Sequence, residues 1–174
     1  VEIEENIEKV IAHFDKIKDV NLPWVNKIEK LKLTKGDGKV VGDHNGAHFY
    51  TIGQRKGLNI GGKPKPLFVL QTDVVENIIY VGQGEDHMGL YSAGLFISKE
   101  EAHWVRPSMK DFVLKSKDLM CRIRYRQSLF HCQLFEQEDG SFILSFQDPQ
   151  KSVTAGQFAT IYLENELIFS GVIS

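Results

Sequence analysis

Between residues 119 and 173 apolar side chains alternate with polar ones, and this pattern constrains the fold more than any other feature. A period of two is typical of strands that bury one face. Glu138-Asp139-Gly140 and Glu164-Asn165 suit tight turns between such strands. Five or six short antiparallel strands in about 70 residues predict a small closed barrel. The expected strands are Leu119–Gln127, Leu129–Glu136, Ser141–Phe146, Gln157–Leu163 and Leu167–Ile173.

The first part of the chain combines a helical pattern with fewer strands. Apolar residues at helical spacing predict an amphipathic helix over Ile3–Ile17, and Leu22–Leu33 predicts a short second helix. The first helix has little helical partner in this chain, so we expect its apolar face to pack on a missing domain or a neighbouring chain. Leu67–Asp73 and Asn77–Gly82 predict a hairpin, and Leu95–Val105 predicts one more strand.

Together these elements predict a mainly β protein with an N-terminal helical segment. We assign residues 1–36 to a helical remnant or linker from a missing domain. Residues 37–97 form a small β-rich central domain, and residues 98–174 form the barrel. The chain has 174 residues, enough for one ordinary domain or two small ones. No apolar run approaches the ~18 residues of a membrane-spanning helix, and no membrane partner is expected.

Positive charge is concentrated in one part of a chain whose formal net charge is −2. Residues 106–126 include seven basic and two acidic side chains. On a strand, Arg122, Arg124 and Arg126 would share one face at intervals of about 7 Å, close to the phosphate spacing of a nucleic-acid strand. Tyr125 would then face inward with Cys121. This arrangement predicts a nucleic-acid contact, with a solvated outer face as the alternative.

The segment Gly42–Gly62, GDHNGAHFYTIGQRKGLNIGG, places Arg55 and Lys56 between glycines. Glycine allows the backbone to approach a ligand closely, and the two cations suit phosphate oxygens. His44 and His48 could face one zinc ion on a helix, but they flank a turn signal and have no third ligand nearby. We therefore expect a phosphate-contacting loop and no metal site.

The remaining candidates for chemistry are Cys121 and Cys132. Each lies in an alternating strand, so we expect reduced, buried thiols in a cytoplasmic protein. A disulfide between neighbouring strands and a reactive thiol beside Arg122 are the alternatives. The chain contains no phosphate-binding G-x-x-x-x-G-K-[ST] loop, no G-x-S-x-G elbow and no dinucleotide fingerprint.

Residues Gly42–Gly62 resemble the signature G-x-H-x-G-x-x-x-Y-T-x-G-Q-R-K-G-L-x-I-G-G, which opens the central domain of the tRNA-specific 2-thiouridylases. The segments Arg122–Gln127, Pro149-Gln150 and Ala155–Gln157 resemble the C-terminal barrel of that family, which commonly has proline in place of Ala155. The resemblance implies a β-rich central domain followed by a six-stranded, translation-factor-like antiparallel β-barrel.

The family resemblance also implies a function. In these enzymes an N-terminal ATP-pyrophosphatase domain adenylates the wobble uridine, and a persulfide cysteine delivers sulfur to its 2-position. This chain lacks that ATP loop and those cysteines, so we predict no catalytic residue, metal or cofactor here. ATP and a sulfur-donor protein belong to the parent enzyme. A loose counterpart of the family's second cysteine segment, Phe14–Lys18, has Asp15 where cysteine would stand. If the two segments correspond, the resemblance implies a parent that is divergent or deficient in sulfur transfer.

Two functional hypotheses follow. In the first, the chain is the tRNA-binding part of a 2-thiouridylase and positions tRNA for the missing domain. The family implies contacts from Arg124, Tyr125 and Gln157. In the second, the barrel docks the catalytic domain or a sulfur carrier without touching RNA. The predicted tRNA-binding residues are Arg55, Lys56, Arg122, Arg124, Tyr125, Arg126 and Gln157.

Overall fold

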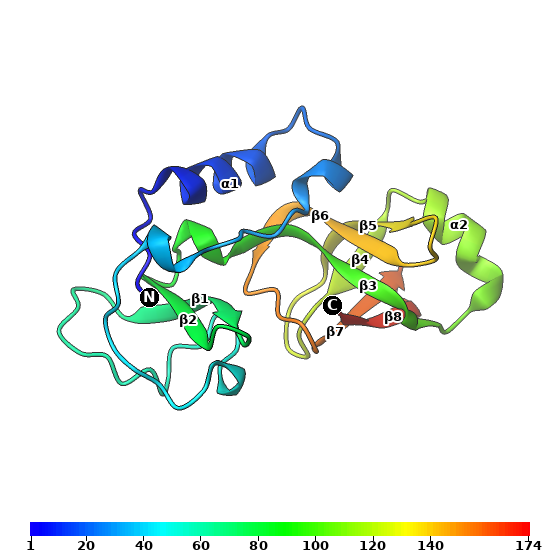
Figure 1. Ribbon diagram of the computed structural model, residues 1–174. Helices are drawn as coiled ribbons and strands as arrows, with labels where there is room; N and C mark the ends of the chain where they lie inside the picture. Colours follow the sequence, from blue (N-terminus) through cyan, green and yellow to red (C-terminus); the bar gives the residue numbers. More distant parts are fainter. The chain divides into compact units, whose positions relative to one another are not determined.

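The computed structural model describes the backbone of residues 1–174 and all side chains except those of residues 24 and 25. The chain divides into two compact units. Unit 1 comprises Val1–Asp19 and Glu29–Tyr91, and unit 2 comprises Val20–Ile28 and Ser92–Ser174. Figure 1 labels the helices and strands of both units. Within the described part of the chain, no helix has the length and apolar character needed to cross a membrane.

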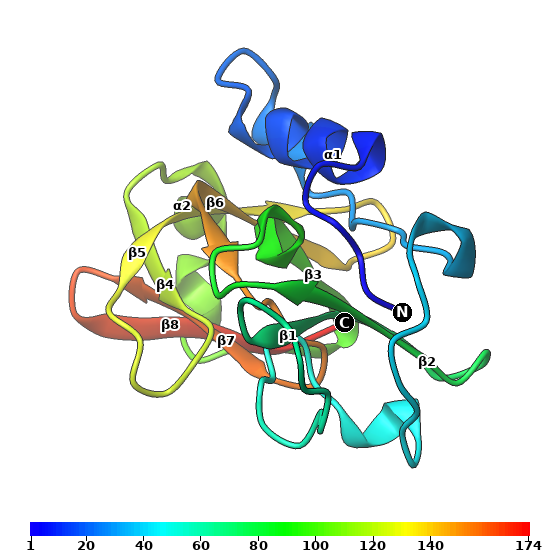
Figure 2. The same ribbon diagram turned by 90° about the vertical axis from the view of Figure 1, so that its left-hand side faces the viewer.

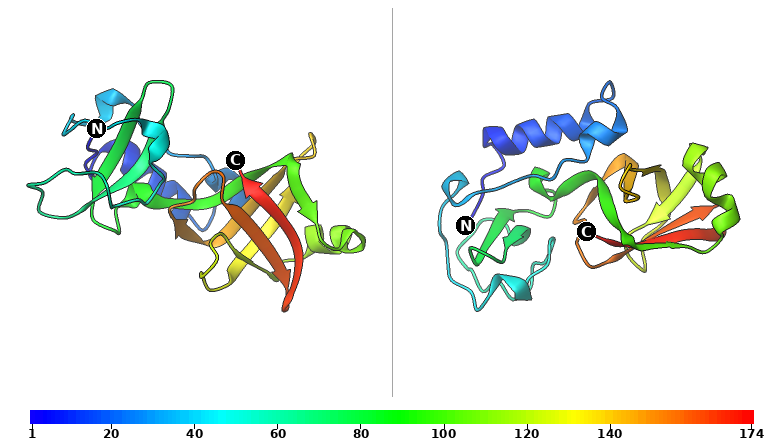
Figure 3. Two further views of the ribbon diagram at one scale, coloured as in Figure 1. Left: turned by 90° about the horizontal axis from the view of Figure 1, so that it is seen from below. Right: turned by 45° about the vertical axis from the view of Figure 1, so that its right-hand side comes forward.

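Unit 2 is built around a closed six-stranded barrel, which confirms the predicted fold class. Its strands follow the order β3-β6-β5-β4-β7-β8, and Figure 3 shows the barrel from two further directions. A short helix, α2 (Lys110–Lys115), which the sequence pattern did not predict, precedes β4. The strands are β3 (Tyr91–Trp104), β4 (Leu119–Arg122), β5 (Phe130–Glu136), β6 (Phe142–Lys151), β7 (Phe158–Leu163) and β8 (Glu166–Ile173).

The barrel interior is filled by the apolar half of the alternating pattern. Along β7, Ala159 and Ile161 are fully buried, whereas Phe158 points to solvent. Cys121 and Cys132 are also buried in this core as free thiols, as predicted. Burial raises the pKa of the Cys121 thiol, and contact with the Cys132 thiol raises it further. Neither sulfur therefore has the exposed, electropositive setting that a reactive thiolate needs.

Unit 1 is centred on the hairpin of β1 (Leu67–Asp73) and β2 (Ile78–Gln83), as the sequence predicted. Both faces of the hairpin are covered. On one face Leu70 and Tyr80 pack with α1 (Glu8–Lys18). On the other face Val69 packs with Leu58 of the segment Gly42–Gly62, which we call the glycine-rich segment. Short 3₁₀ helices lie at Lys35–Asp37, Ala47–Phe49 and Met88–Leu90.

The N-terminal helix is shorter than predicted because the first residues join the sheet. Glu2 bridges Lys39 and Val81, and the Ile3 amide donates to the Val81 carbonyl at 2.8 Å, beside β2 (Figure 2). The apolar face of α1 buries Val10 completely within unit 1. The prediction that this face lacks a partner in the chain is therefore wrong.

The second predicted helix, Leu22–Leu33, is also wrong over most of its length. The structure has only a 3₁₀ helix at Trp24–Lys27, and the side chains of residues 24 and 25 lie outside the description. Gln71 of β1 explains the non-helical end of this segment. Its side-chain amide accepts from the Leu33 amide at 2.8 Å and donates to the Leu33 carbonyl at 3.1 Å, so these backbone groups bond to Gln71.

His87 is a buried polar residue that links the hairpin to the N-terminal segment. Its Nδ1 accepts from the Gly89 amide at 3.0 Å, and Nε2 lies 3.3 Å from the Ile3 carbonyl. The ring is therefore neutral and carries its proton on Nε2. It occupies the space where a side chain at Gly82 would lie, because a Cβ there would meet the ring at 2.5 Å.

This buried histidine predicts loss of stability in mild acid. Burial lowers the pKa of His87 below its ordinary value of 6.5. Between that lowered value and 6.5 the unfolded chain binds more protons, so the free energy of unfolding falls as pH drops below about 6.5. Urea titrations on both sides of this pH should show a lower midpoint in acid. His87→Asn, which retains an acceptor for Gly89 but does not titrate, should reduce the difference; an unchanged difference would contradict the assignment. His13 is partly buried, and burial lowers its pKa as well, so His13 should leave some pH dependence.

Candidate nucleic-acid interface

The predicted line of three arginines on one strand is wrong, because β4 ends at Arg122. Beyond it the chain turns. The side-chain oxygen of Gln127 accepts from the backbone amide of Ile123 at 3.1 Å. The backbone amide of Gln127 donates to the Arg124 carbonyl at 3.2 Å. These local bonds replace the continued strand pairing that alternation alone predicted. Arg122 therefore lies on a strand, while Arg124 and Arg126 lie in the following turn.

The turn also reverses the predicted orientation of Tyr125. Alternation predicted an inward ring beside Cys121, but the Tyr125 side chain is 90% exposed. Ile123, by contrast, remains buried as predicted. The tyrosine is therefore available to a ligand without any opening of the barrel.

A surface depression of about 630 Å³ brings together four of the seven predicted residues. Arg122 and Thr160 are paired across neighbouring strands β4 and β7, and they place the depression on the outer face of the barrel. Arg126 does not line it. Its lining includes Arg122, Arg124, Tyr125, Gln157, Phe158, Thr160 and Tyr162.

The two arginines of the depression are held by neutral groups. Arg122 donates to the Tyr162 hydroxyl at 2.9 Å, and its guanidinium lies 5.0 Å from the centre of that ring. Arg124 donates to the carbonyls of Lys151 and Ser152. No carboxylate lines the depression, and within the described residues neither guanidinium forms an ion pair. The site therefore keeps its positive charge, which suits an anionic ligand.

Sequence reasoning missed two aromatic residues of this site. Phe158 and Tyr162 lie on the outer face of β7, on either side of Thr160, and Phe158 is 64% exposed. A signal was present in the sequence, because an alternating strand that places two aromatic rings on its solvent face is unusual. Only the pairing of β4 with β7 shows that this face adjoins Arg122.

The basic pair of the glycine-rich segment belongs to unit 1 and has a different electrostatic setting. Arg55 and Lys56 are both exposed. Arg55 lines a depression of about 550 Å³ together with Lys65 and three acidic residues, Glu5, Glu85 and Asp86. The neighbouring cation Lys63 is paired with Glu2. Positive charge is thus less concentrated here than in the barrel depression.

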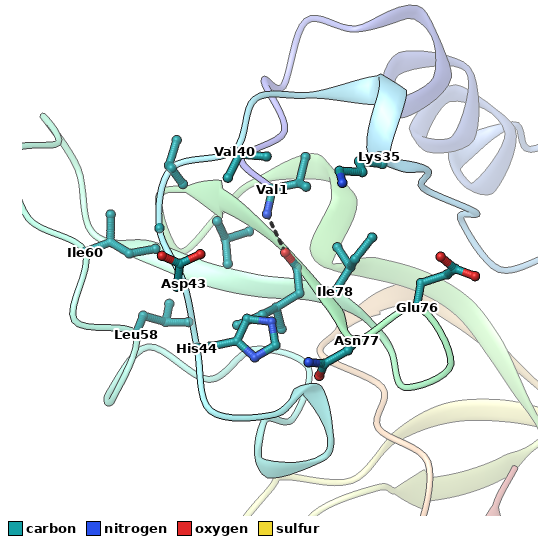
Figure 4. Close-up of a pocket in the computed structure, with 14 residues that line it drawn as sticks. Val1, Lys35, Val40, Asp43, His44, Leu58, Ile60, Glu76, Asn77 and Ile78 are labelled. Atoms are coloured by element: carbon teal, nitrogen blue, oxygen red, sulfur yellow. Dashed lines mark hydrogen bonds between the residues drawn. The ribbon is translucent and has the colours of Figure 1, made fainter.

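Figure 4 shows another depression in unit 1, of about 320 Å³, lined partly by the glycine-rich segment. The carboxylates of Asp43 and Glu76 line it together with Lys35 and several aliphatic side chains, so it does not favour a phosphate. His44 accepts from the Gly46 amide at 3.1 Å, and His48 stacks on Phe49 with ring centres 4.0 Å apart. Among the described residues, no three His, Cys, Asp or Glu side chains are grouped to hold a metal ion.

Two family models match the chain. Residues 28–83 match the tRNA methyl transferase PRC-barrel domain, and residues 96–173 match the aminomethyltransferase beta-barrel domain. Together the two models define the class as proteins in which a PRC-barrel central domain is followed by a C-terminal β-barrel domain. The second model covers the strands that carry the barrel depression.

Curated relatives specify the family. The chain is 47% identical over 178 residues to the tRNA-specific 2-thiouridylase MnmA of Christiangramia forsetii and 45% identical over 176 residues to that of Flavobacterium johnsoniae. These alignments cover 97% and 100% of this chain but only 44% of each relative. The same enzyme of Shouchella clausii is 39% identical over 79% of this chain. The chain belongs to the tRNA-specific 2-thiouridylase family and corresponds to its central and C-terminal domains.

Proposed function

We propose that this chain is the tRNA-binding part of a tRNA-specific 2-thiouridylase and that its barrel holds tRNA for a catalytic domain elsewhere in the parent protein. One observation carries the proposal. Arg122 and Arg124 line a single depression free of carboxylates, in a chain whose formal net charge is −2. Local positive charge of this kind is the electrostatic signature of a nucleic-acid surface.

The contacts of the two arginines suit this role. Arg122 is oriented by the Tyr162 ring and hydroxyl, so less side-chain freedom is lost when it binds a phosphate. Arg124 bonds to two backbone carbonyls through one nitrogen, which leaves other guanidinium N–H groups for a ligand. Tyr125 and Gln157 add an exposed ring and an exposed amide for contacts with bases.

The chemistry of the parent protein is part of the proposal. The relatives are named for thiolation of tRNA, and this chain spans less than half of their length. We therefore propose that sulfur transfer to the 2-position of the wobble uridine uses ATP and a sulfur-donor protein at the parent's other domain, in the cytoplasm. The residues of this chain bind and orient the tRNA.

The proposal predicts that tRNA binding depends strongly on salt. Each phosphate neutralised by Lys or Arg releases counterions, so about four to six contacts give a log–log slope of affinity against salt of about −3 to −5. Filter-binding titrations of the 174-residue chain with unmodified tRNA would measure this slope. Arg124→Gln should weaken binding by roughly 1–2 kcal/mol and reduce the slope by about 1. An affinity independent of salt would refute the proposal.

The protein-docking hypothesis now has less support. It depended on an unpartnered apolar face of the N-terminal helix, but that face buries Val10 within unit 1. Ile11 on the same helix stays exposed, with 39% of its area accessible. Part of the apolar face that supported a docking role therefore has its partner within unit 1.

A further inference from the structure

The outer face of β7 has a large-small-large arrangement of side chains. Phe158, Thr160 and Tyr162 share this face because alternate residues of a strand point the same way. About 13 Å of strand separates Phe158 from Tyr162, and only the small side chain of Thr160 lies between them on β7. The threonine hydroxyl donates to the Arg122 carbonyl at 3.3 Å, which ties the middle of the face to β4.

One end of this arrangement is preorganised and the other is open. At one end the Arg122 guanidinium lies over the Tyr162 ring and is held by its hydroxyl. At the other end the Phe158 ring is 64% exposed. The Tyr125 ring, 90% exposed, lines the same depression from the turn after β4. Two exposed aromatic rings beside an immobilised guanidinium plane are a suitable surface for stacking a planar group.

We infer that the depression binds an unpaired nucleobase, with Phe158 as the stacking platform and Arg124 directed at the adjoining phosphate. This inference rests on the proposed function and specifies how the RNA is held. Charge complementarity favours a nucleotide as the occupant, because the lining has two guanidinium groups and no carboxylate. Bases displaced from a loop commonly stack on aromatic and guanidinium planes, and the exposed Gln157 amide can both donate and accept at a base edge.

A pair of ligands with equal backbone charge tests this inference. The full chain is titrated with a fluorescein-labelled ten-nucleotide oligouridylate and with an abasic oligoribonucleotide of the same length. We expect the wild-type chain to bind oligouridylate roughly 5- to 100-fold more tightly, the range for stacking on aromatic side chains. Phe158→Leu should remove most of this preference, and Phe158→Tyr should retain it. Because Phe158 carries no charge, the salt slope of Phe158→Leu should equal that of the wild type.

Two further variants distinguish failure of this inference from failure of the proposed tRNA binding. Phe112→Leu replaces another exposed phenylalanine of unit 2, on α2 and outside the depression, and should keep the preference for bases. Arg124→Gln should weaken binding of both ligands. Equal affinity of the wild type for the two ligands, or no binding of either, would overturn the inference. In that case salt-dependent binding of tRNA would still support the proposed function, whereas its absence would remove both.

Discussion

Replacement of Phe169 with alanine is expected to lower the free energy of unfolding of unit 2 by about 3–5 kcal/mol. The Phe169 side chain has no exposed area. Its ring centre lies 4.9 Å from that of Trp104 and 5.2 Å from that of Phe142, so its removal leaves a cavity bounded by two aromatic rings. Domains are stable by only about 5–15 kcal/mol, and this one change should therefore remove much of the stability of the barrel.

Urea denaturation followed by circular dichroism would measure the Phe169→Ala effect. Phe112→Ala is the matched control, because its ring is 55% exposed and its loss should cost less than about 1 kcal/mol. Similar losses for the two variants would show that Phe169 is not part of a tightly packed core. The Phe169→Ala protein should also lose tRNA binding in proportion to its unfolded fraction, since β7 and β8 are neighbours in the barrel.

The double variant Arg122→Gln/Arg124→Gln is expected to weaken tRNA binding by roughly 30- to 1,000-fold, because two charge-assisted phosphate contacts are lost. The log–log salt slope should decrease by about 2. Filter binding gives both quantities. Both arginines also bond to groups of the barrel, so the urea midpoint of the variant must be measured alongside.

A second double variant is the control for loss of charge. Arg106→Gln/Lys110→Gln also removes two positive charges from unit 2, but Arg106 is paired with Glu166 and Lys110 with Glu136. Their fields are partly cancelled by these carboxylates, so tRNA affinity should change less than about threefold. If both double variants weakened binding equally, net charge rather than the depression would explain the affinity, and the assigned site would be wrong.

Much of the fold could be predicted from the sequence because local pattern and final environment agree. In β5 and β7 the fully buried residues alternate with more exposed ones and belong to the barrel core. The predicted bounds of β5, β7 and β8 lie within one residue of the observed bounds. The β1–β2 hairpin was equally predictable. The N-terminal helix was predicted too long, because the pairing of Glu2 with Val81 depends on a strand far along the chain.

The site was less predictable, because the same alternation continues past the true end of β4. Arg122 to Gln127 has the pattern of a strand, yet the strand ends at Arg122 and a turn follows it. Gln127 bonds to the Ile123 amide and also to the Gln150 side chain at 3.0 Å. The second of these contacts joins residues 23 positions apart, so no local pattern could reveal it. Because the chain turns here, the Tyr125 side chain is exposed and does not face the barrel interior.

By itself, the sequence determined the mainly β architecture, the family and the local excess of positive charge over residues 106–126, since each depends on residue type and short-range order. The tertiary structure alone decided which of those charges lie together and what lies beside them. Strand pairing places Arg122 opposite Thr160, which lies 38 positions later in the chain. The Arg122 guanidinium and the Phe158 ring therefore line the same depression. A binding surface assembled across paired strands depends on register, and register is a property of the closed barrel.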